Sequence, residues 1–257
     1  MRVFDQTSFS LAGKVAVVTG GARGLGKYYS IALAMYGADI FVVSGSQTGW
    51  QAVRERVEQL GRRIEFLQRD ITEDGAAAEI VAAVLEAYGR LDILVNNAGI
   101  QRRNDVLEFT DDDWRRVIDV NLNGLYYLSH EAAKVMVKQR QGKIINIGSM
   151  QSYRAGKRIF PYAASKHAVL GLTRAYADAL APYNIQVNGL APGYIETDMT
   201  KPLQEDPVRG PEIVGHIPSG EWGTPDKLMG PMVFLASDAS NYVTGVMLPV
   251  DGGYLLR

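Results

Sequence analysis

Strand-forming and helix-forming segments alternate along almost the whole chain, and this alternation restricts the fold more than any other feature. Seven short runs are rich in Val, Ile and Leu, as buried parallel strands are. They comprise residues 15–19, 40–43, 64–67, 93–95, 144–147, 185–187 and 246–250. Longer stretches with apolar residues at three- and four-residue spacing separate most of these runs and predict helices. They comprise residues 25–36, 51–60, 75–88, 112–139, 162–180 and 226–236.

Strands that are apolar throughout must be covered on both faces, and the intervening helices can supply that cover. The pattern therefore predicts an α/β fold, a doubly wound parallel sheet of about seven strands in a Rossmann-type three-layer α/β/α sandwich. Right-handed crossovers place the carboxyl ends of all the strands at one edge of such a sheet, where ligands bind.

The composition is that of one soluble globular domain spanning residues 1–257, with 47% apolar and 21% charged residues. The net charge is −1 and the charges are spread without blocks, so no nucleic-acid or acidic-membrane partner is indicated and a small-molecule partner is expected. There is no cysteine, and His130, His167 and His216 lack the spacing of metal ligands. No metal is therefore expected.

The first ten residues lack the apolar core of a secretory signal, and no later apolar run approaches membrane-spanning length. These features predict a cytoplasmic protein. The segment 192–221 departs from the regular pattern, because it holds five of the ten prolines. An irregular stretch of this length inside a compact domain is more often functional than a linker, so we interpret it as a substrate lid.

The first predicted strand runs into a glycine-rich turn, Thr19-Gly20-Gly21-Ala22-Arg23-Gly24-Leu25-Gly26. Glycines here allow a tight turn and a close approach to phosphate oxygens, and the following helix offers free N–H groups to a pyrophosphate. The residues nearly match a triphosphate-binding loop, but Tyr28 stands where Ser or Thr must bind magnesium. The glycines could also serve only the corner between strand and helix.

Tyr162 and Lys166 lie four residues apart at the start of a predicted helix, which puts both side chains on one face about 6 Å apart. A tyrosine that acts as a base near neutral pH needs its pKa lowered by about three units, worth about 4 kcal/mol. A neighbouring ammonium can supply much of that stabilisation. The alternative is a packed tyrosine beside a solvated lysine.

Six motifs occur together in an order and at spacings that match one enzyme family. They are Thr19-Gly20-x3-Gly24-x-Gly26, Asn96-Asn97-Ala98-Gly99, Asn121, Ser149, Tyr162-x3-Lys166 and Pro192-Gly193. From about residue 11 to residue 253 the chain resembles the short-chain dehydrogenases/reductases. This resemblance implies hydride transfer between a nicotinamide cofactor and an alcohol or carbonyl.

The resemblance also implies a role for each of four catalytic residues. Tyr162 is the general acid/base, and Lys166 lowers its pKa and bonds the nicotinamide ribose. Ser149 bonds the reacting oxygen, although a serine at a strand end can also serve a turn. Asn121 holds a water that links Lys166 to solvent. Since Asn is a poor helix former, a special role or a local kink is expected at this position.

The cofactor-binding residues implied by the resemblance come from the glycine-rich turn and from the ends of the later strands. They are Gly20, Arg23, Gly24, Leu25, Gly26, Ser44, Asp70, Ile71, Asn97, Ala98, Gly99, Tyr162, Lys166, Pro192, Gly193, Ile195 and Thr197. Asp70 is expected at adenine but could equally cap the next helix, and the turn at 96–99 could be plain turn chemistry.

The choice between NAD and NADP depends on the end of the second strand. An acidic residue there usually bonds the ribose 2′-hydroxyl of NAD, but this chain has Ser44. Arg23 could instead attract the 2′-phosphate of NADP. We predict NAD from the closer resemblance described next, and NADP remains an alternative.

Four stretches resemble the sugar-acid dehydrogenases, the group of 2-dehydro-3-deoxy-D-gluconate 5-dehydrogenases and gluconate 5-dehydrogenases. They are residues 97–103, 143–150, 217–225 and 250–257. A sugar acid needs a cation for its carboxylate and hydrogen-bonding groups for its hydroxyls. The predicted substrate residues are Ser149, Gln151, Tyr162, Arg103 and Arg154, with Arg103 and Gln151 as first choices.

Two other functions share much of this sequence pattern. A carbonyl, polyol or 3-oxoacyl-thioester reductase would use the same catalytic residues, and a nucleotide-sensing protein could use the same fold. The sensor alternative is disfavoured because all four catalytic residues are present. The resemblance implies a homo-oligomer, a tetramer, in which the predicted helices 112–139 and 162–180 could pair across a two-fold axis.

Overall fold

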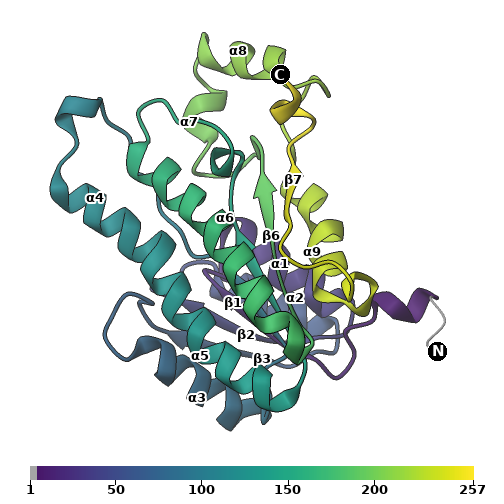
Figure 1. Cartoon of the computed structure of the whole chain (residues 1–257). Helices are drawn as coiled ribbons and strands as arrows, with labels where there is room; N and C mark the ends of the chain where they lie inside the picture. The colour runs from purple at the N-terminus through teal and green to yellow at the C-terminus, as the bar shows by residue number, and fades with distance from the viewer. Residues whose placement is uncertain (1–4) are drawn as a thin grey trace.

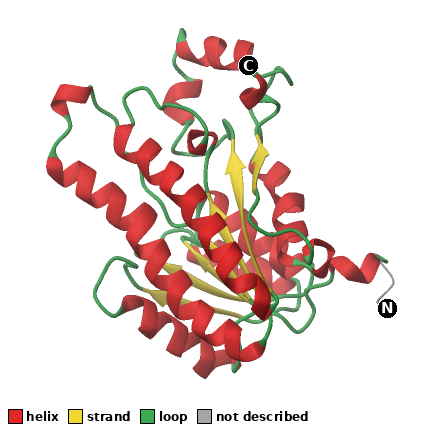
Figure 2. Ribbon diagram, viewed as in Figure 1, coloured by secondary structure: helices red, strands yellow, loops and turns green. Residues whose placement is uncertain are grey.

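The computed structural model describes residues 5–257 and contains one seven-stranded sheet in which every neighbouring pair of strands is parallel (Figures 1 and 2). The strands lie in the order β3-β2-β1-β4-β5-β6-β7. Their bounds are β1 Val15–Thr19, β2 Asp39–Ser44, β3 Ile64–Gln68, β4 Ile93–Asn96, β5 Gly142–Ile147, β6 Ile185–Pro192 and β7 Met247–Val250. The predicted doubly wound α/β sandwich is therefore confirmed.

Helices cover both faces of the sheet, with α3, α5 and α6 on one face and α1, α2 and α9 on the other (Figure 1). The α-helices are α1 Gly24–Met35, α2 Trp50–Gln59, α3 Ala76–Tyr88, α4 Asp111–Ile118, α5 Gly124–Gln139, α6 Phe160–Leu180, α7 Lys201–Gln204, α8 Arg209–His216 and α9 Met229–Ala236. Along β1, Ala16 and Val18 pack toward one helical layer while Val15 and Val17 pack toward the other. This explains why all four positions from Val15 to Val18 are apolar.

The strand order reverses between β1 and β4, because the chain proceeds from β1 toward β3 on one side and from β4 toward β7 on the other. At such a point the loops after two adjacent strands diverge and leave a crevice at their carboxyl ends. The glycine-rich turn follows β1, and the turn at 96–99 follows β4. Both predicted cofactor motifs therefore lie at this reversal.

The stretch 112–139 is not the single helix that the sequence predicts. It contains α4, a π-helical turn η3 at Asp119–Asn123, and α5. Asn121 lies within the π turn, so the expected local irregularity is present. π turns inside α-helices occur frequently at functional sites.

Two short helices, α7 and α8, lie within the segment 192–221 that the sequence predicts to be irregular. Strand β6 extends from Ile185 to Pro192, so it ends five residues beyond the predicted strand at 185–187. The role of this segment as a lid remains a prediction. Among the helices of residues 5–257, none has both the length and the apolar character that a membrane span requires, and the cytoplasmic location also remains a prediction.

Tyr29 is a buried core residue whose hydroxyl group has no hydrogen-bond partner within residues 5–257. Burial raises the pKa of Tyr29, with a smaller contribution from Tyr162. A buried polar group without a partner costs about 1–3 kcal/mol. We therefore expect Tyr29→Phe to raise the free energy of unfolding by about 1 kcal/mol or more, a Tm gain of roughly 2–4 °C per kcal/mol, measured by thermal and urea denaturation.

Tyr88→Phe is the matched control, because the Tyr88 hydroxyl donates a hydrogen bond to the Ile40 carbonyl at 2.9 Å. Removing this hydroxyl should lower stability by about 1 kcal/mol. A loss of stability in Tyr29→Phe as large as that in Tyr88→Phe would contradict an unpartnered Tyr29.

Candidate active site

The turn between β1 and α1 has the backbone geometry of a phosphate cradle. Gly24 has φ +52°, a left-handed conformation that favours glycine. A Cβ on Gly26 would overlap the Gly20 carbonyl oxygen and would stand 2.6 Å from Asn97 Nδ2. Arg23 is the N-cap of α1, but its side chain makes no capping bond. The first N–H groups of α1 are therefore open to an anion, and the turn fits a dinucleotide pyrophosphate.

The turn after β4 is fastened to the end of β1 by hydrogen bonds. The Thr19 hydroxyl accepts bonds from the backbone N–H groups of Asn97 and Ala98 at 3.0 and 2.9 Å. Asn97 Nδ2 donates to the Thr19 carbonyl at 2.8 Å. Asn97 and Ala98 thus hold the two edges of the crevice together, a structural contribution beside their predicted contact with cofactor.

The ends of β2 and β3 carry the predicted adenosine residues. Ser44 ends β2 and is half-buried, and the chain then passes against the glycine-rich turn, where a Cβ on Gly49 would stand 3.5 Å from the Arg23 Cβ. No carboxylate ends β2. The hydroxyl of Ser44 and the exposed guanidinium of Arg23 therefore flank the region where a ribose 2′-oxygen is expected.

Asp70 follows β3 and does not cap the next helix, whose N-cap is Gly75. Its carboxylate accepts bonds from the backbone and hydroxyl of Thr72 and pairs with Arg116 at 2.8 Å. Burial acts to raise the pKa of Asp70, but the bonds from Arg116 and Thr72 outweigh burial and lower it. Ile71 is buried and would meet any Cβ on Gly124, so it packs against the start of α5.

Ser149, Tyr162 and Lys166 converge where β5 ends and α6 begins. The Ser149 hydroxyl accepts the Gln151 N–H at 3.1 Å and bonds the Tyr162 hydroxyl. Lys166 Nζ donates to the Ile147 carbonyl at 2.6 Å and lies 5.5 Å from the centroid of the Tyr162 ring. Tyr162 and Lys166 share a face of α6, as the spacing predicts.

In this cluster, burial favours the neutral forms of both Tyr162 and Lys166. Burial raises the pKa of Tyr162, while the Ser149 hydrogen bond lowers it to a smaller extent. Burial lowers the pKa of Lys166 to about 8. Such perturbed, mutually adjacent titratable groups at the carboxyl edge of an α/β sheet are typical of an acid/base centre.

Asn121 connects the π turn to the turn after β4. Its Oδ1 accepts the Ile100 N–H at 2.8 Å, and its Nδ2 donates to the Ile100 carbonyl at 3.0 Å and to Ser165 Oγ at 3.1 Å. Ser165 directly precedes Lys166 on α6. The side chain of Asn121 therefore fixes three segments of the centre, and its role in holding a water remains a prediction.

The residues after β6 lie at the same edge. A Cβ on Gly193 would stand 2.6 Å from the Asp251 backbone, so this segment packs closely on the chain after β7. Ile195 is buried and forms an isolated bridge with Gly223. The Thr197 N–H donates to Thr200 Oγ1 at 3.0 Å, which shapes the start of the α7 segment. Pro192, Gly193, Ile195 and Thr197 are thus placed along one wall.

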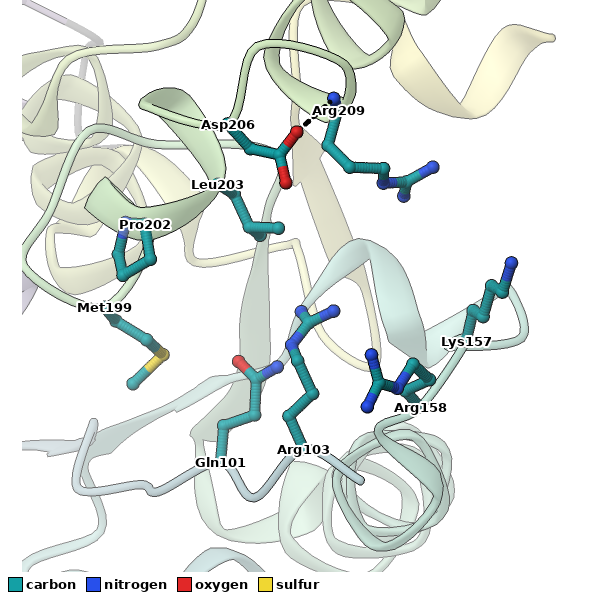
Figure 3. Close-up of a pocket in the computed structure, with 9 residues that line it drawn as sticks. All are labelled: Gln101, Arg103, Lys157, Arg158, Met199, Pro202, Leu203, Asp206 and Arg209. Carbon is teal, nitrogen blue, oxygen red and sulfur yellow. Dashed lines mark hydrogen bonds between the residues drawn. The ribbon is translucent and has the colours of Figure 1, made fainter. Parts of the chain in front are cut away.

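A cavity of about 550 Å³ opens among the segments that follow β4, β5 and β6, at the same edge of the sheet as the centre (Figure 3). Its lining comes from the loop after β4, the segment between Ser149 and Tyr162, and the α7–α8 segment. The lining residues are Gln101, Arg103, Lys157, Arg158, Met199, Pro202, Leu203, Asp206 and Arg209. The predicted substrate residue Arg103 is among them and reaches toward the middle of the cavity (Figure 3).

Gln151 and Arg154 do not line this cavity. The buried Gln151 carboxamide faces the carbonyls of Arg154 and Ala155, to which its nitrogen donates at 3.1 and 2.9 Å in the orientation that satisfies both. Arg154 contacts His216 Nε2 at 3.1 Å and stacks on the Tyr254 ring at 4.8 Å. The structure thus uses these two side chains to hold the loop and the C-terminal segment.

Sequence reasoning did not commit to Lys157, Arg158 or Arg209, although all three line the cavity. The first two stand in the loop between Ser149 and Tyr162, where the sequence offers them, like Arg154, as cations that could bind the substrate, although they are not among the predicted substrate residues. Arg158 has φ +64°, a backbone conformation that a sequence does not reveal for arginine. Arg209 comes from α8, about 100 residues away from Arg103 in the chain, and only the fold brings the two together.

Groups of three or more His, Cys, Asp or Glu side chains that could hold a metal ion do not occur within residues 5–257. The chemistry available at this edge is therefore built from a phosphate cradle, a tyrosine–lysine–serine cluster and a cationic cavity. These parts suit a nucleotide cofactor and an oxygen-bearing anionic substrate.

Several known proteins are similar to this chain in sequence and in structure. A family model described as short chain dehydrogenase matches residues 14–208. The uncharacterised oxidoreductase YgcW of Escherichia coli K12 is 49% identical over 257 residues, with 100% of this chain and 98% of that protein covered. The 2-dehydro-3-deoxy-D-gluconate 5-dehydrogenase of E. coli K12 is 47% identical over 256 residues, with 98% of this chain and 99% of that protein covered.

A solved structure shares the fold closely. The gluconate 5-dehydrogenase of Burkholderia cenocepacia J2315, in complex with NADP and tartrate, is 38% identical with a TM-score of 0.93, and 97% of this chain and 98% of that one are covered. The chain therefore belongs to the short-chain dehydrogenases/reductases and is a nicotinamide-dependent oxidoreductase that acts on a CH–OH group.

Proposed function

We propose that this enzyme transfers hydride between a nicotinamide cofactor and a secondary alcohol or ketone of a sugar acid of the gluconate or deoxy-ketogluconate type. The observation that carries the proposal is the cationic cavity whose lining includes Lys157 and Arg158 of the loop between Ser149 and Tyr162, because a sugar acid needs a cation for its carboxylate. The names of the relatives support the same substrate class.

Tyr162 is proposed as the general acid/base. In oxidation its phenolate oxygen takes the proton from the substrate hydroxyl, and in reduction its hydroxyl returns that proton to the forming alkoxide. Ser149 accepts the Gln151 N–H, which leaves its own proton free to donate to the phenolate or the reacting oxygen. The nicotinamide, when bound, accepts or supplies the hydride.

Lys166 assists this proton transfer through its ammonium, which lies 5.5 Å from the centroid of the Tyr162 ring. Its ammonium, held by the Ile147 carbonyl, favours the phenolate form of Tyr162 through space. Tyr162 also lies in the first turn of α6, where the helix dipole favours negative charge. These two effects oppose the burial that raises the Tyr162 pKa, so catalysis depends on the ammonium being protonated.

A panel of substrates and cofactors tests the proposal. Gluconate, a 3-deoxy-2-keto sugar acid, neutral polyols and 3-oxoacyl thioesters would each be assayed with NAD(H) and NADP(H). We expect the highest kcat/KM for a sugar acid. Activity confined to polyols or thioesters would instead support the alternative reductases, which share Tyr162, Lys166 and Ser149 and differ only in the pocket.

Both nicotinamides are proposed to bind. The NAD preference taken from the sequence remains a prediction, and the absence of a carboxylate at the end of β2 together with exposed Arg23 supports NADP as well. A charge-assisted hydrogen bond is worth about 1.5–3 kcal/mol, or roughly tenfold or more in affinity. We expect Arg23→Ala to raise the Kd of NADP about tenfold and that of NAD less than about twofold, measured by calorimetric titration.

The control for this experiment is Arg54→Ala, which removes an exposed arginine of α2 that pairs with Glu58. Arg54→Ala should leave both dissociation constants unchanged. Equal weakening of NAD and NADP in Arg23→Ala would assign Arg23 to the shape of the turn and not to the 2′-phosphate.

A homo-oligomer is also proposed. Trp114, Tyr126 and Tyr127 on α4 and α5 are 47%, 40% and 51% exposed, which is unusual for large aromatic side chains on helices of a monomer. The two-fold pairing expected for these helices would cover them. Sedimentation equilibrium of the purified protein tests this, and a monomer at micromolar concentration would contradict it.

A further inference from the structure

The cavity beside the active centre brings four cations together from three segments that lie far apart in the sequence. Arg103 comes from the loop after β4, Lys157 and Arg158 from the segment between Ser149 and Tyr162, and Arg209 from the start of α8. Met199, Pro202 and Leu203 supply an apolar side. The cavity therefore combines an apolar side with a cluster of cationic side chains.

The charges of this cavity are nearly, but not fully, compensated by the protein. Arg158 pairs with Asp105 at 3.1 Å, and Arg209 pairs with Glu212 at 2.8 Å. Asp206 is the carboxylate of the lining. Within residues 5–257, neither Arg103 nor Lys157 has a carboxylate partner. Four cations line the cavity, and three carboxylates, Asp206 in the lining and the ion-pair partners Asp105 and Glu212 outside it, leave one positive charge uncompensated.

Arg209 is held in place by the start of its own helix. Asp206 Oδ1 accepts the N–H groups of Val208 and Arg209 at 2.9 and 2.8 Å, which fixes the turn that leads into α8. Figure 3 shows Arg103 rising from the lower loop and Arg209 extending from the opposite segment. Burial, followed by Tyr254, raises the pKa of Tyr194 to about 12, and the charges of Arg209 and Arg103 act in the opposite direction.

We propose that Arg209 is a specificity-determining residue which, together with Arg103, binds the carboxylate of the substrate and selects acids that carry a single negative charge. The proposal rests on the proposed sugar-acid function and adds to it the residue and the charge that the cavity accepts. One carboxylate neutralises the uncompensated charge, whereas a neutral polyol leaves it and a dicarboxylate reverses it.

Three six-carbon compounds of matched backbone test the charge rule: gluconate, the neutral polyol sorbitol and the dicarboxylate glucarate. With the full-length enzyme and saturating cofactor, we expect kcat/KM for gluconate to exceed that for sorbitol by about tenfold or more, and to exceed that for glucarate as well. Arg209→Gln should lower kcat/KM for gluconate about tenfold, mainly by raising KM, and should change kcat/KM for sorbitol less than about twofold. Arg209→Lys should recover most of the loss.

Two further variants separate charge recognition from damage to the segment. Lys201→Gln removes an exposed α7 cation that pairs with Glu205 and does not line the cavity. It should therefore leave kcat/KM unchanged for all three substrates. Glu212→Gln removes the partner of Arg209 and adds one uncompensated positive charge. It should therefore raise kcat/KM for glucarate relative to gluconate, the opposite direction to Arg209→Gln.

The outcomes distinguish this inference from the proposed function. Suppose that the wild-type enzyme oxidises gluconate, and that Arg209→Gln either lowers kcat/KM equally for gluconate and sorbitol or changes neither value. Arg209 then does not recognise the carboxylate, and the inference is overturned. If the wild-type enzyme acts on no sugar acid, the proposed function itself fails. A decrease in kcat/KM for gluconate alone in Arg209→Gln, together with a relative increase in kcat/KM for glucarate in Glu212→Gln, supports both the inference and the proposed function.

Discussion

Replacing Tyr162 by Phe is expected to lower kcat by roughly 10²–10⁴-fold, the range that a positioned general acid/base supplies. The variant removes only the hydroxyl oxygen that bonds Ser149, and leaves the ring that packs over Lys166. Cofactor affinity should change less than about twofold, because the phosphate cradle after β1 is untouched. Steady-state kinetics and calorimetric titration of NADP measure the two effects separately.

Tyr153→Phe is the matched control, because Tyr153 lies nine residues before Tyr162 and its hydroxyl donates a partly buried hydrogen bond to the Met247 carbonyl at 2.6 Å. This bond supports the fold, so the control should lose about 1 kcal/mol of stability and keep its turnover. If Tyr162→Phe keeps its kcat, or loses no more than Tyr153→Phe, the proton must pass through another group.

The layers and strand order of the fold follow from elementary rules that the sequence displays. Seven apolar runs separated by helices can be buried on both faces only in a doubly wound parallel sheet, and the structure has that sheet. Segment ends differ by a residue or a few, because burial and capping decide them. The division of 112–139 by a π turn is a larger difference. The hydrogen bonds from Asn121 to Ile100 and Ser165 stabilise a local backbone geometry that helix propensity does not favour.

The local chemistry of the site was also predictable, because Tyr162 and Lys166 share one helix and their spacing alone sets their geometry. The substrate side was less predictable. Gln151 was a first choice for substrate, yet its carboxamide is directed at the carbonyls of Arg154 and Ala155. Arg209 was not considered, because its proximity to Arg103 arises from the packing of the α7–α8 segment and no periodicity in the sequence reports it.

Lys166 is the second residue for which a large effect is expected. Lys166→Met should lower kcat by roughly 10²-fold or more at pH 7, because the phenolate of Tyr162 then loses the ammonium that offsets its burial. The same substitution should change the pH dependence of stability. Burial lowers the pKa of Lys166 to about 8 in the folded protein, below its ordinary value of 10.5.

The sign of this dependence follows from proton binding. Between pH 8 and 10.5 the unfolded chain keeps the Lys166 proton while the folded protein releases it, so the free energy of unfolding of the cofactor-free wild type should rise with pH. The limiting slope is about 1.4 kcal/mol per pH unit for one proton. Below pH 8 the full cost of the buried ammonium is present. Above pH 10 buried tyrosines with raised pKa values, such as Tyr176 and Tyr194, act in the opposite direction.

Lys143 provides the comparison that assigns this effect. Burial also lowers the pKa of Lys143 to about 8. Its ammonium donates hydrogen bonds to Ser240 and Asn241, which are far from Tyr162 in the sequence. Urea unfolding between pH 8 and 10 should therefore show a rise of about 2–3 kcal/mol from each lysine, and either Lys166→Met or Lys143→Met should remove roughly half of the total. Only Lys166→Met should also lose turnover. An unchanged pH slope in Lys166→Met would mean that the ammonium stays solvated, and the electrostatic support proposed for the Tyr162 phenolate would then be too weak to drive catalysis.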